Sequence, residues 1–510
     1  MTHASTLASA APTDRRPDPT ATRARHASRR AASRSGRGLA LTLTLALGLT
    51  AVTLAGWVGA LSYYGTHFRG WDAQLYYAHL RSAVIDGDLA IANELERTQS
   101  SAIFDGPDAG PWGGLPRRVD GGPANPYTIG SAVAAAPAFL AAHAWSLANG
   151  SLADGYARPY EAAVTLWYGL IAVLGALALY AALAKRITPP AAAIGVGLGF
   201  LGTGVAYYAG VFPLMNHATS FGALATLTAL ALHLHDRPTH KAAWAAAAGL
   251  AFLIVLTRPT DATLLLVLLP AWLRLRGAKA KAAVATLGAA SVGLAYGGQL
   301  LVWRIAFGEW VSNAYTRWTG GQGFDFTQPR ILDLLFSGQG GGWLFHPLLG
   351  VGLLGLVLAV VVGTRPSAGQ RNPQPISDAL QTNTRPAPGL SRPMLLAMAA
   401  AVAAHALAYS CWVSWDSGTS FGNRVFVNST PMVMVGLAWW AAVALRARPV
   451  ATRAASLGLA AGVACACLLW NGLLLINDVE QRLPAKETAT AAAVWDAQID
   501  TLARLTGTAP

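Results

Sequence analysis

Long runs of apolar residues alternate with short polar segments along most of this chain. A helix needs about 20 apolar residues to cross the core of a bilayer, and the longer runs meet that requirement. The strands of a membrane β-barrel would instead alternate between apolar and polar positions. The pattern therefore predicts an all-α, multi-pass transmembrane helical bundle of about 11 spans. The expected spans are 39–61, 158–184, 190–209, 213–234, 242–257, 260–273, 282–306, 343–363, 394–412, 431–445 and 454–476.

Composition separates this chain from soluble proteins. It has 510 residues, of which 54% are hydrophobic and only 12% are charged. Soluble domains carry about 25% charged residues, so a soluble enzyme of two or three domains is excluded, and the abundance of apolar residues excludes a disordered chain. The net charge of +13 is compatible with nucleic-acid binding. However, the basic residues lie mostly between apolar runs, so we expect a lipid bilayer and no nucleic acid as the partner.

The placement of charge orients the predicted spans. With the N-terminus in the cytoplasm, every inside loop is basic and most of the 24 acidic residues fall outside, as the positive-inside rule requires. Residues 128–148 are apolar enough to span, but a crossing there would turn all later basic loops outward. We therefore expect a re-entrant or interfacial helix on the outer face. The C-terminus is expected outside, in a protein of the cytoplasmic (inner) membrane.

Three regions follow from this topology. Residues 1–38 are Arg- and Ser-rich and predict a disordered basic cytoplasmic tail, for which an organelle transit peptide is the alternative. Residues 39–477 form the transmembrane domain, with a first outer loop at 62–157 and a Pro- and Arg-rich cytoplasmic linker at 364–393. Residues 478–510 are an outer C-terminal tail with an amphipathic helix expected over 488–505.

The first outer loop carries the strongest candidate chemistry. Read as a helix from Asp72, it places Asp72, Tyr76, His79 and Asp86 on one face, so that a carboxylate, a phenol and an imidazole lie together. Helix capping by Asp72, or simple solvation, is the alternative. Asp86 and Asp88 flank a glycine, and this spacing suits either a tight turn or a divalent cation, for which the sequence gives no further support. No cofactor is otherwise indicated.

Four further polar residues lie at the expected outer ends of spans. Arg258 and Arg424 are candidates for phosphate binding through the planar guanidinium, and an interfacial anchor is the alternative for each. His217 and His346 lie within or beside apolar segments, where a polar group is a functional candidate, although a lone histidine there is more often a hydrogen-bonded core residue.

Several short motifs, in this order, resemble those of the polytopic membrane glycosyltransferases of the C-type fold. Within that family the pattern is similar to bacterial relatives of protein O-mannosyltransferases and of the lipid A aminoarabinose transferase. The landmarks are Trp71-Asp72 with Tyr76-Tyr77, Tyr127-Thr128-Ile129-Gly130, Phe212-Pro213 with His217, Arg258-Pro259-Thr260, Phe336-Ser337 through Pro347, and Trp412 to Arg424. One departure is Ala73, which stands where many members have a second acid.

The resemblance implies transfer of a sugar from a polyprenyl-phosphate carrier to a glycan, lipid or protein acceptor on the outer face, with Asp72 as the catalytic base. The other candidates, Tyr76, His79, His217, Arg258, His346 and Arg424, are expected to bind substrate. A single base with direct displacement would invert the anomeric configuration. Two other classes stay open, namely a transporter or lipid flippase and a non-catalytic membrane assembly subunit.

Overall fold

The computed structural model describes residues 19–98, 114–362, 389–418, 420–447, 449–485 and 488–508. The chain divides into two compact units, Met1–Thr44 and Leu45–Pro510. The described part of the first unit consists of the beginning of helix α1 (Pro19–Tyr64), which therefore starts within the predicted tail. The predicted cytoplasmic linker lies almost wholly outside the described residues.

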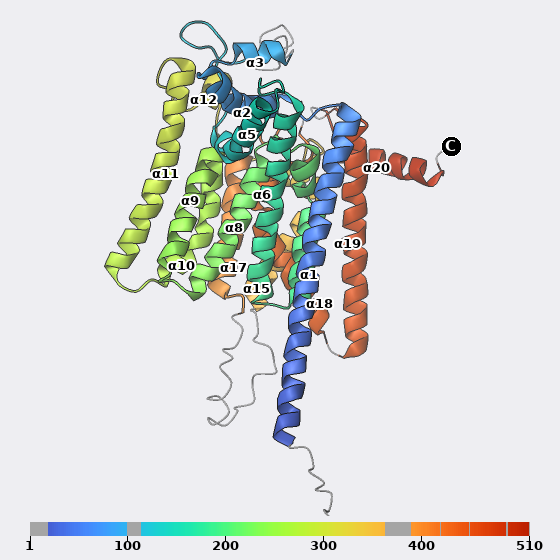
Figure 1. Ribbon diagram of the computed structural model, residues 1–510. Helices are drawn as coiled ribbons and strands as arrows, with labels where there is room; N and C mark the ends of the chain where they lie inside the picture. Colours follow the sequence, from blue (N-terminus) through green and yellow to red (C-terminus); the bar gives the residue numbers. More distant parts are fainter. Residues whose placement is uncertain are drawn as a thin grey trace, which may run out of the picture. The chain divides into compact units, whose positions relative to one another are not determined.

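Helices make up nearly all of the regular structure of the second unit (Figure 1). No strand forms in the described ranges, where the β-type pairings are two isolated bridges, Arg117 with Pro123 and Phe324 with Trp412. The prediction of an all-α fold is thus confirmed. The helices of the first half are α2 (Trp71–Arg81), η1 (Ser82–Asp86), α3 (Ala92–Arg97), α5 (Gly130–Ala148), α6 (Arg158–Ala184), α7 (Pro189–Leu201), η2 (Tyr207–Val211), α8 (His217–Asp236) and α9 (Lys241–Thr257).

Each remaining predicted span also coincides with helical structure. The helices of the second half are η3 (Pro259–Leu268), α10 (Leu269–Leu273), α11 (Ala278–Phe307), α12 (Ala314–Trp318), α13 (Ile331–Phe336), α14 (Gly342–Phe345), α15 (Pro347–Val362), α17 (Arg392–Ser410), α18 (Phe426–Arg446), α19 (Val450–Val479) and α20 (Ala491–Thr506). Helix α20 corresponds to the helix expected in the C-terminal tail.

Three predicted spans are interrupted rather than continuous. The segment 260–273 is a 3₁₀ helix followed by one α-helical turn, and Pro270 lies at that junction. The segment 343–363 breaks between α14 and α15 at His346, directly before Pro347, because proline disfavours the α-conformation in the residue that precedes it. The segment 190–209 ends as an α-helix at Leu201, and the chain then bends into the π-helical turn η2.

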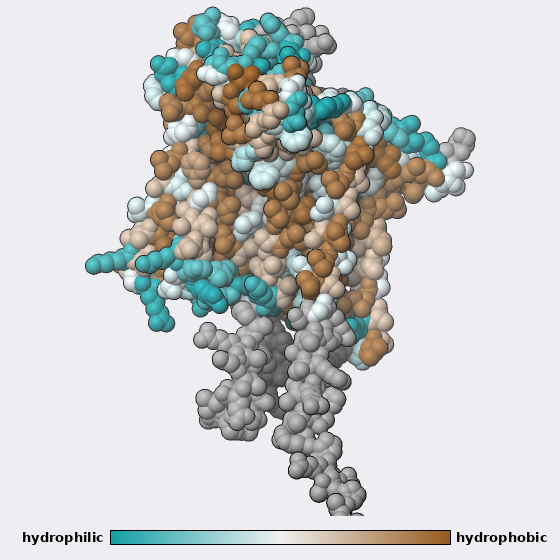
Figure 2. All heavy atoms as spheres, viewed as in Figure 1, coloured by the Kyte–Doolittle hydropathy of each residue, from teal (hydrophilic) through white to brown (hydrophobic). Residues whose placement is uncertain are grey.

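Seven helices in the described part of the chain are long and apolar enough to cross a membrane, and α5 is one of them. Large apolar side chains point outward from several, among them Leu174, Leu294 and Leu459. Figure 2 shows these hydrophobic surfaces over the middle of the helices, while hydrophilic residues gather around α2 and α3 and at the loop between α10 and α11. Such an apolar belt is typical of a protein solvated by lipid. The number of crossings stays a prediction.

Helix α18 is the most buried of the seven candidate spans, and it contacts α7, α8 and α15. The short helices α2, α3 and α12 gather with α5 at one end of the longer helices (Figure 1). Arg424 lies in the segment just before α18, and Arg258 directly follows α9, both at this end. The fold thus brings the first predicted outer loop to the same end as both candidate arginines.

Candidate functional site

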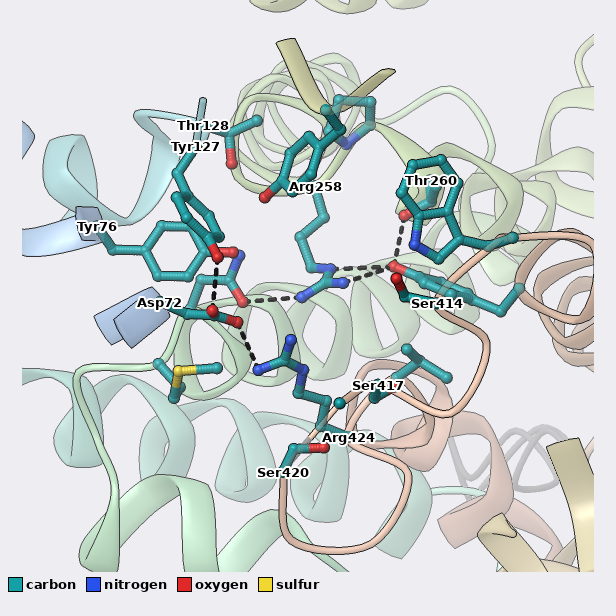
Figure 3. A pocket seen from close by; sticks show the side chains of 18 of the residues that line it. Asp72, Tyr76, Tyr127, Thr128, Arg258, Thr260, Ser414, Ser417, Ser420 and Arg424 are labelled. Atoms are coloured by element: carbon teal, nitrogen blue, oxygen red, sulfur yellow. Dashed lines mark hydrogen bonds and ion pairs between the residues drawn. The ribbon is translucent and has the colours of Figure 1, made fainter. Parts of the chain in front are cut away.

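A cavity of about 610 Å³ lies at this end of the second unit. Its wall is assembled from several stretches of chain that are far apart in sequence (Figure 3). These include the start of α2, the segment before α5, the turn between α9 and η3, the region around α12, and the loop between α17 and α18. Of the predicted site residues, Asp72, Tyr76, Arg258 and Arg424 line the cavity.

Asp72 lies in the first turn of α2 and projects into the cavity. Gly70, which is the N-cap residue of α2, has φ 78°, and a Cβ there would lie 2.3 Å from the Phe212 ring. Only glycine accommodates both restrictions, and this fixes where α2 starts. Gly70 thus occupies the N-cap position that was considered for Asp72, and no side chain caps α2 there. The carboxylate of Asp72 instead accepts a hydrogen bond of 2.5 Å from the Tyr127 hydroxyl and pairs with Arg424 Nη1 at 2.6 Å.

Both members of the Asp72–Arg424 pair keep access to the cavity. Their side chains are 18% and 21% exposed, respectively, so a ligand could reach either group. Tyr127 is buried, and Tyr76 packs edge-on against it with ring centroids 4.7 Å apart. Burial raises the pKa of Tyr127 well above its ordinary value and that of Tyr76 to about 12, and the nearby Asp72 carboxylate adds to both effects. Tyr127 therefore stays protonated and remains a hydrogen-bond donor to Asp72.

Arg258 is positioned by the proline that follows it. Helix α9 ends at Thr257, and Arg258 is extended (φ −150°, ψ 105°), as expected of a residue before proline. The guanidinium donates from Nε and Nη2 to the Tyr409 hydroxyl, at 3.1 and 2.8 Å. Its Nη1 group donates to Asn216 Oδ1 and to His217 Nε2, both at 3.1 Å.

The loop that presents Arg424 is held by its own side chains. Asn423 donates to the Trp415 carbonyl at 3.0 Å and accepts from the Ser417 hydroxyl at 3.0 Å. Gly422 has φ 56°, and a Cβ there would lie 2.6 Å from His346 Nε2. The absence of a side chain at Gly422 therefore lets the loop approach His346. Asp416, from the same loop, also lines the cavity, and its carboxylate accepts from the Gly418 amide at 3.3 Å.

The three predicted histidines do not line the cavity. His79 is buried, with Nε2 3.0 Å from the Tyr127 carbonyl oxygen, and burial lowers its pKa to about 4. His346 is buried against Asn471, with 2.8 Å between Nδ1 and Oδ1. His217 lies behind Arg258. The structure thus places all three in the walls, where each supports a neighbouring group.

Asp86 does not share a face with Asp72, contrary to expectation. The helix changes from α to π at Ser82–Asp86, and the wider π turn shifts the later residues around the helix axis. Asp86 pairs instead with Arg81, and Asp88 accepts from the Ser82 hydroxyl at 2.7 Å. Among the described residues, no group of three or more His, Cys, Asp or Glu side chains is arranged to hold a metal ion.

Several residues of the site were not predicted as such. Tyr127, Tyr409 and Asn216 contact the charged groups directly, while Asp261 and Asn428 lie behind Arg258, fully buried. Asp261 lies between Thr260 and Thr263, and Asn428 is followed by Ser429 and Thr430, so both belong to polar clusters that border apolar runs. Polar residues within or beside such runs are functional candidates, and this is the signal that could have identified both.

No protein-family model and no curated protein sequence matches this chain. The resemblance to the C-type glycosyltransferases therefore stays a prediction. The cavity itself combines a carboxylate paired with one arginine, a second arginine held by buried polar groups, and an aromatic wall.

Proposed function

We propose that this chain is an integral membrane glycosyltransferase. It would transfer a sugar from a polyprenyl-phosphate carrier to a hydroxyl group of an envelope glycan, lipid or protein. The observation that supports this most directly is the Asp72–Arg424 pair in the cavity wall. A carboxylate that can accept a proton adjoins a cation that can bind a phosphate, and the reaction requires both groups.

The proposed chemistry is a single displacement. Asp72 takes the proton of the acceptor hydroxyl as its oxygen attacks the anomeric carbon. The bond from that carbon to the phosphate oxygen breaks, and the lipid phosphate leaves with the electron pair. The leaving group is stable as an anion, so no strong general acid is needed. Arg424 stabilises the negative charge that accumulates on the phosphate, and the anomeric configuration inverts.

The pairing of Asp72 with Arg424 gives the donor a second role. Before substrate binds, Arg424 is paired with the Asp72 carboxylate. A phosphate that accepts hydrogen bonds from Arg424 competes with Asp72 for the guanidinium. The base is then released in the same step that places the donor, so proton abstraction is favoured only when the donor is present.

Aromatic side chains make up much of the remaining wall, including Trp71, Tyr315, Trp318 and Trp412. The C–H-rich faces of sugar rings pack well on such surfaces, and pockets for small molecules commonly combine apolar walls with a few polar groups. This lining supports a carbohydrate substrate better than a small inorganic one.

We further propose that the cavity faces the outside of the cytoplasmic membrane, with about 11 crossings, the N-terminus inside and the C-terminus outside. The positive-inside distribution of charge supports this orientation. Helix α5 would then lie in the outer leaflet beside α2, which it contacts.

The decisive experiment incubates the purified protein with a panel of polyprenyl-phosphate sugars and an envelope extract, and measures release of the free lipid phosphate. We expect release from one donor, dependent on the acceptor extract. Absence of release from every donor in the panel would contradict the proposal.

One observation favours a transporter instead. Asp261 is fully buried within the described helices, beside His405 and Asn428, and ionisable residues within a membrane protein often line a transport path. A lipid flippase would move the polyprenyl-phosphate sugar across vesicles without releasing lipid phosphate, so the same panel in proteoliposomes separates the two functions. A non-catalytic assembly subunit would do neither.

A further inference from the structure

A chain of hydrogen bonds runs from the cavity wall into the protein interior. Arg258 Nη1 donates to His217 Nε2 at 3.1 Å, and His217 Nδ1 lies 3.1 Å from Asn428 Oδ1. Asn428 Nδ2 in turn lies 3.0 and 2.9 Å from the two carboxylate oxygens of Asp261. We call Arg258, His217, Asn428 and Asp261 the Arg258 relay.

The chemistry of each group fixes the direction of the relay. Both carboxylate oxygens of Asp261 accept from the Asn428 amide nitrogen, so the carbonyl oxygen of Asn428 faces His217. His217 must then carry its hydrogen on Nδ1, which leaves the lone pair of Nε2 to accept from Arg258. The opposite tautomer, or an imidazolium, would bring an N–H group against an N–H group of the guanidinium.

Protein acceptors use most of the hydrogen-bonding capacity of Arg258, and one of these bonds belongs to the relay. The guanidinium has five N–H groups. The two on Nη1 donate to Asn216 and His217, and the one on Nε and one of the two on Nη2 donate to Tyr409. One N–H, on Nη2, is left over. Arg258 therefore presents a fixed positive charge to the cavity and lacks the two free donors of a bidentate phosphate clamp. Arg424 has no such set of protein acceptors in the described residues apart from Asp72.

His217, Asn428 and Asp261 are each 0% exposed. They come from three elements, the start of α8, the first turns of α18 and the start of η3. A substrate in the cavity cannot reach them, but a change in any of them alters the surroundings of Arg258. Figure 3 shows the Arg258 side chain reaching into the cavity between Asp72 and Thr260.

We infer that Asp261, Asn428 and His217 are positioning residues that hold the Arg258 guanidinium at a fixed place in the cavity wall. This inference rests on the proposed function for its catalytic consequence, which is that the fixed charge of Arg258 stabilises the departing phosphate. His217 thereby acts through Arg258 and not through a contact with sugar.

The first test is Asn428→Ala. Displacement of a charged group by about 1 Å can reduce a rate by up to about 100-fold, so we expect kcat to fall about 10- to 100-fold. The donor KM should change less than about threefold, because Arg424 still binds the phosphate. The matched control is Asn477→Ala, which removes another fully buried, hydrogen-bonded asparagine, located in the last turn of α19 and bonded to α20. Equal effects of both variants on kcat would overturn the inference.

A double-variant cycle tests whether Asn428 acts through Arg258. In an Arg258→Lys background the relay has no guanidinium to hold, so Asn428→Ala should cause no further loss of kcat. If the losses from the two substitutions multiply, Asn428 acts independently of Arg258 and the inference is wrong.

His217 provides a second test if Asn428→Ala fails to fold. Glutamine has both an acceptor and a donor in its amide, so His217→Gln preserves both bonds of the relay, whereas His217→Leu preserves only the size. We expect His217→Gln to keep kcat within about fivefold of the wild type and His217→Leu to lose at least tenfold more. Equal loss in the two variants would contradict a relay through this position.

Thermal unfolding tests the relay without any sugar donor. The decrease in Tm caused by Arg258→Lys and His217→Leu together should be smaller than the sum of the separate decreases, because both substitutions break the same chain. Strictly additive decreases would overturn the relay even in an active enzyme. A non-additive result in a protein that transfers no sugar would support the relay and contradict only the proposed function.

Discussion

Replacing Asp72 with asparagine separates a catalytic role from a structural one. Asparagine keeps the size of the side chain, and its amide oxygen can still accept the hydrogen bond from Tyr127. It cannot accept a proton from an acceptor hydroxyl, and it removes the charge that pairs with Arg424. The substitution thus eliminates the proposed base and preserves most of the local geometry.

The size of each effect follows from the surroundings of the pair. Both side chains are about one-fifth exposed, so the lost ion pair is partly screened and should cost about 1–2 kcal/mol of stability. Loss of a general base lowers a rate about 10²- to 10⁴-fold, which corresponds to about 3–5 kcal/mol in the activation free energy. The catalytic effect exceeds the structural one, so Asp72→Asn should be folded and almost inactive.

Donor binding gives a second, opposite signal. Arg424 is released from its carboxylate partner in Asp72→Asn, so affinity for the lipid phosphate should stay the same or increase. The assay measures release of lipid phosphate for turnover and, separately, equilibrium binding of a labelled polyprenyl phosphate. Asp416→Asn is the matched control, since it removes the other carboxylate in the cavity lining, whose hydrogen bond to the Gly418 amide an asparagine can maintain.

Two results would refute this reasoning. Near wild-type transfer by Asp72→Asn would show that Asp72 is not the base. If Asp416→Asn were then the inactive variant, the base would be Asp416. Asp86 and Asp88, the other two acids at the end of this helix, do not belong to the cavity lining.

Further predictions concern the cation, the phenol, one histidine and the topology. Arg424→Lys keeps the charge but loses the planar fork, so donor affinity should fall about tenfold, and a fall no larger in Arg424→Ala than in Arg424→Lys, with turnover intact, would assign Arg424 to anchoring. Tyr127→Phe removes a hydrogen bond from Asp72 and should reduce kcat by less than about 10-fold with an unchanged donor KM; inactivity would make Tyr127 part of the chemistry. Because burial lowers the pKa of His79 to about 4, the unfolded chain takes up a proton as pH falls below about 6.5 while the native state does not. Stability should therefore decrease from about pH 6.5 toward 4, and His79→Gln should lose less Tm than the wild type over that range. A reporter fused after Pro510 should be active only outside the cytoplasm, and the reverse result would contradict the proposed topology.

The sequence predicted the helices well where their boundaries depend on local signals. The span 158–184 coincides with α6, which follows an extended Ala157 and has Pro159 in its first turn. Interrupted spans were predicted as continuous because hydropathy averages over a window and does not register a break. The sharp turn at His346-Pro347 lies inside one apolar run, and the residue that marks it is a single proline.

The candidate site could be predicted only where local sequence signals identify its residues. Arg258 and Arg424 were identified by their position near the ends of apolar runs, and Asp72 by the helical pattern of the loop that follows the first span and by the family resemblance. Whether they meet depends on contacts between distant parts of the chain, such as the 151 residues that separate Arg258 from Tyr409. Periodicity along a single helix carries no information about such contacts.

The histidines show why residue type alone was insufficient. A histidine in an apolar segment signals that some polar partner exists nearby, but the partner can be a substrate, a backbone carbonyl or an asparagine. In this protein the partners are the Tyr127 carbonyl for His79, Asn471 for His346, and Asn428 with Arg258 for His217. Since asparagine is rare in apolar helices for the same reason as histidine, the better sequence signal is a pair of such residues at similar depth in two spans. By this criterion, His217 and Asn428 would have indicated a buried contact between two spans. Arg258, which lies at the end of the neighbouring span, would then have been the expected partner of that contact.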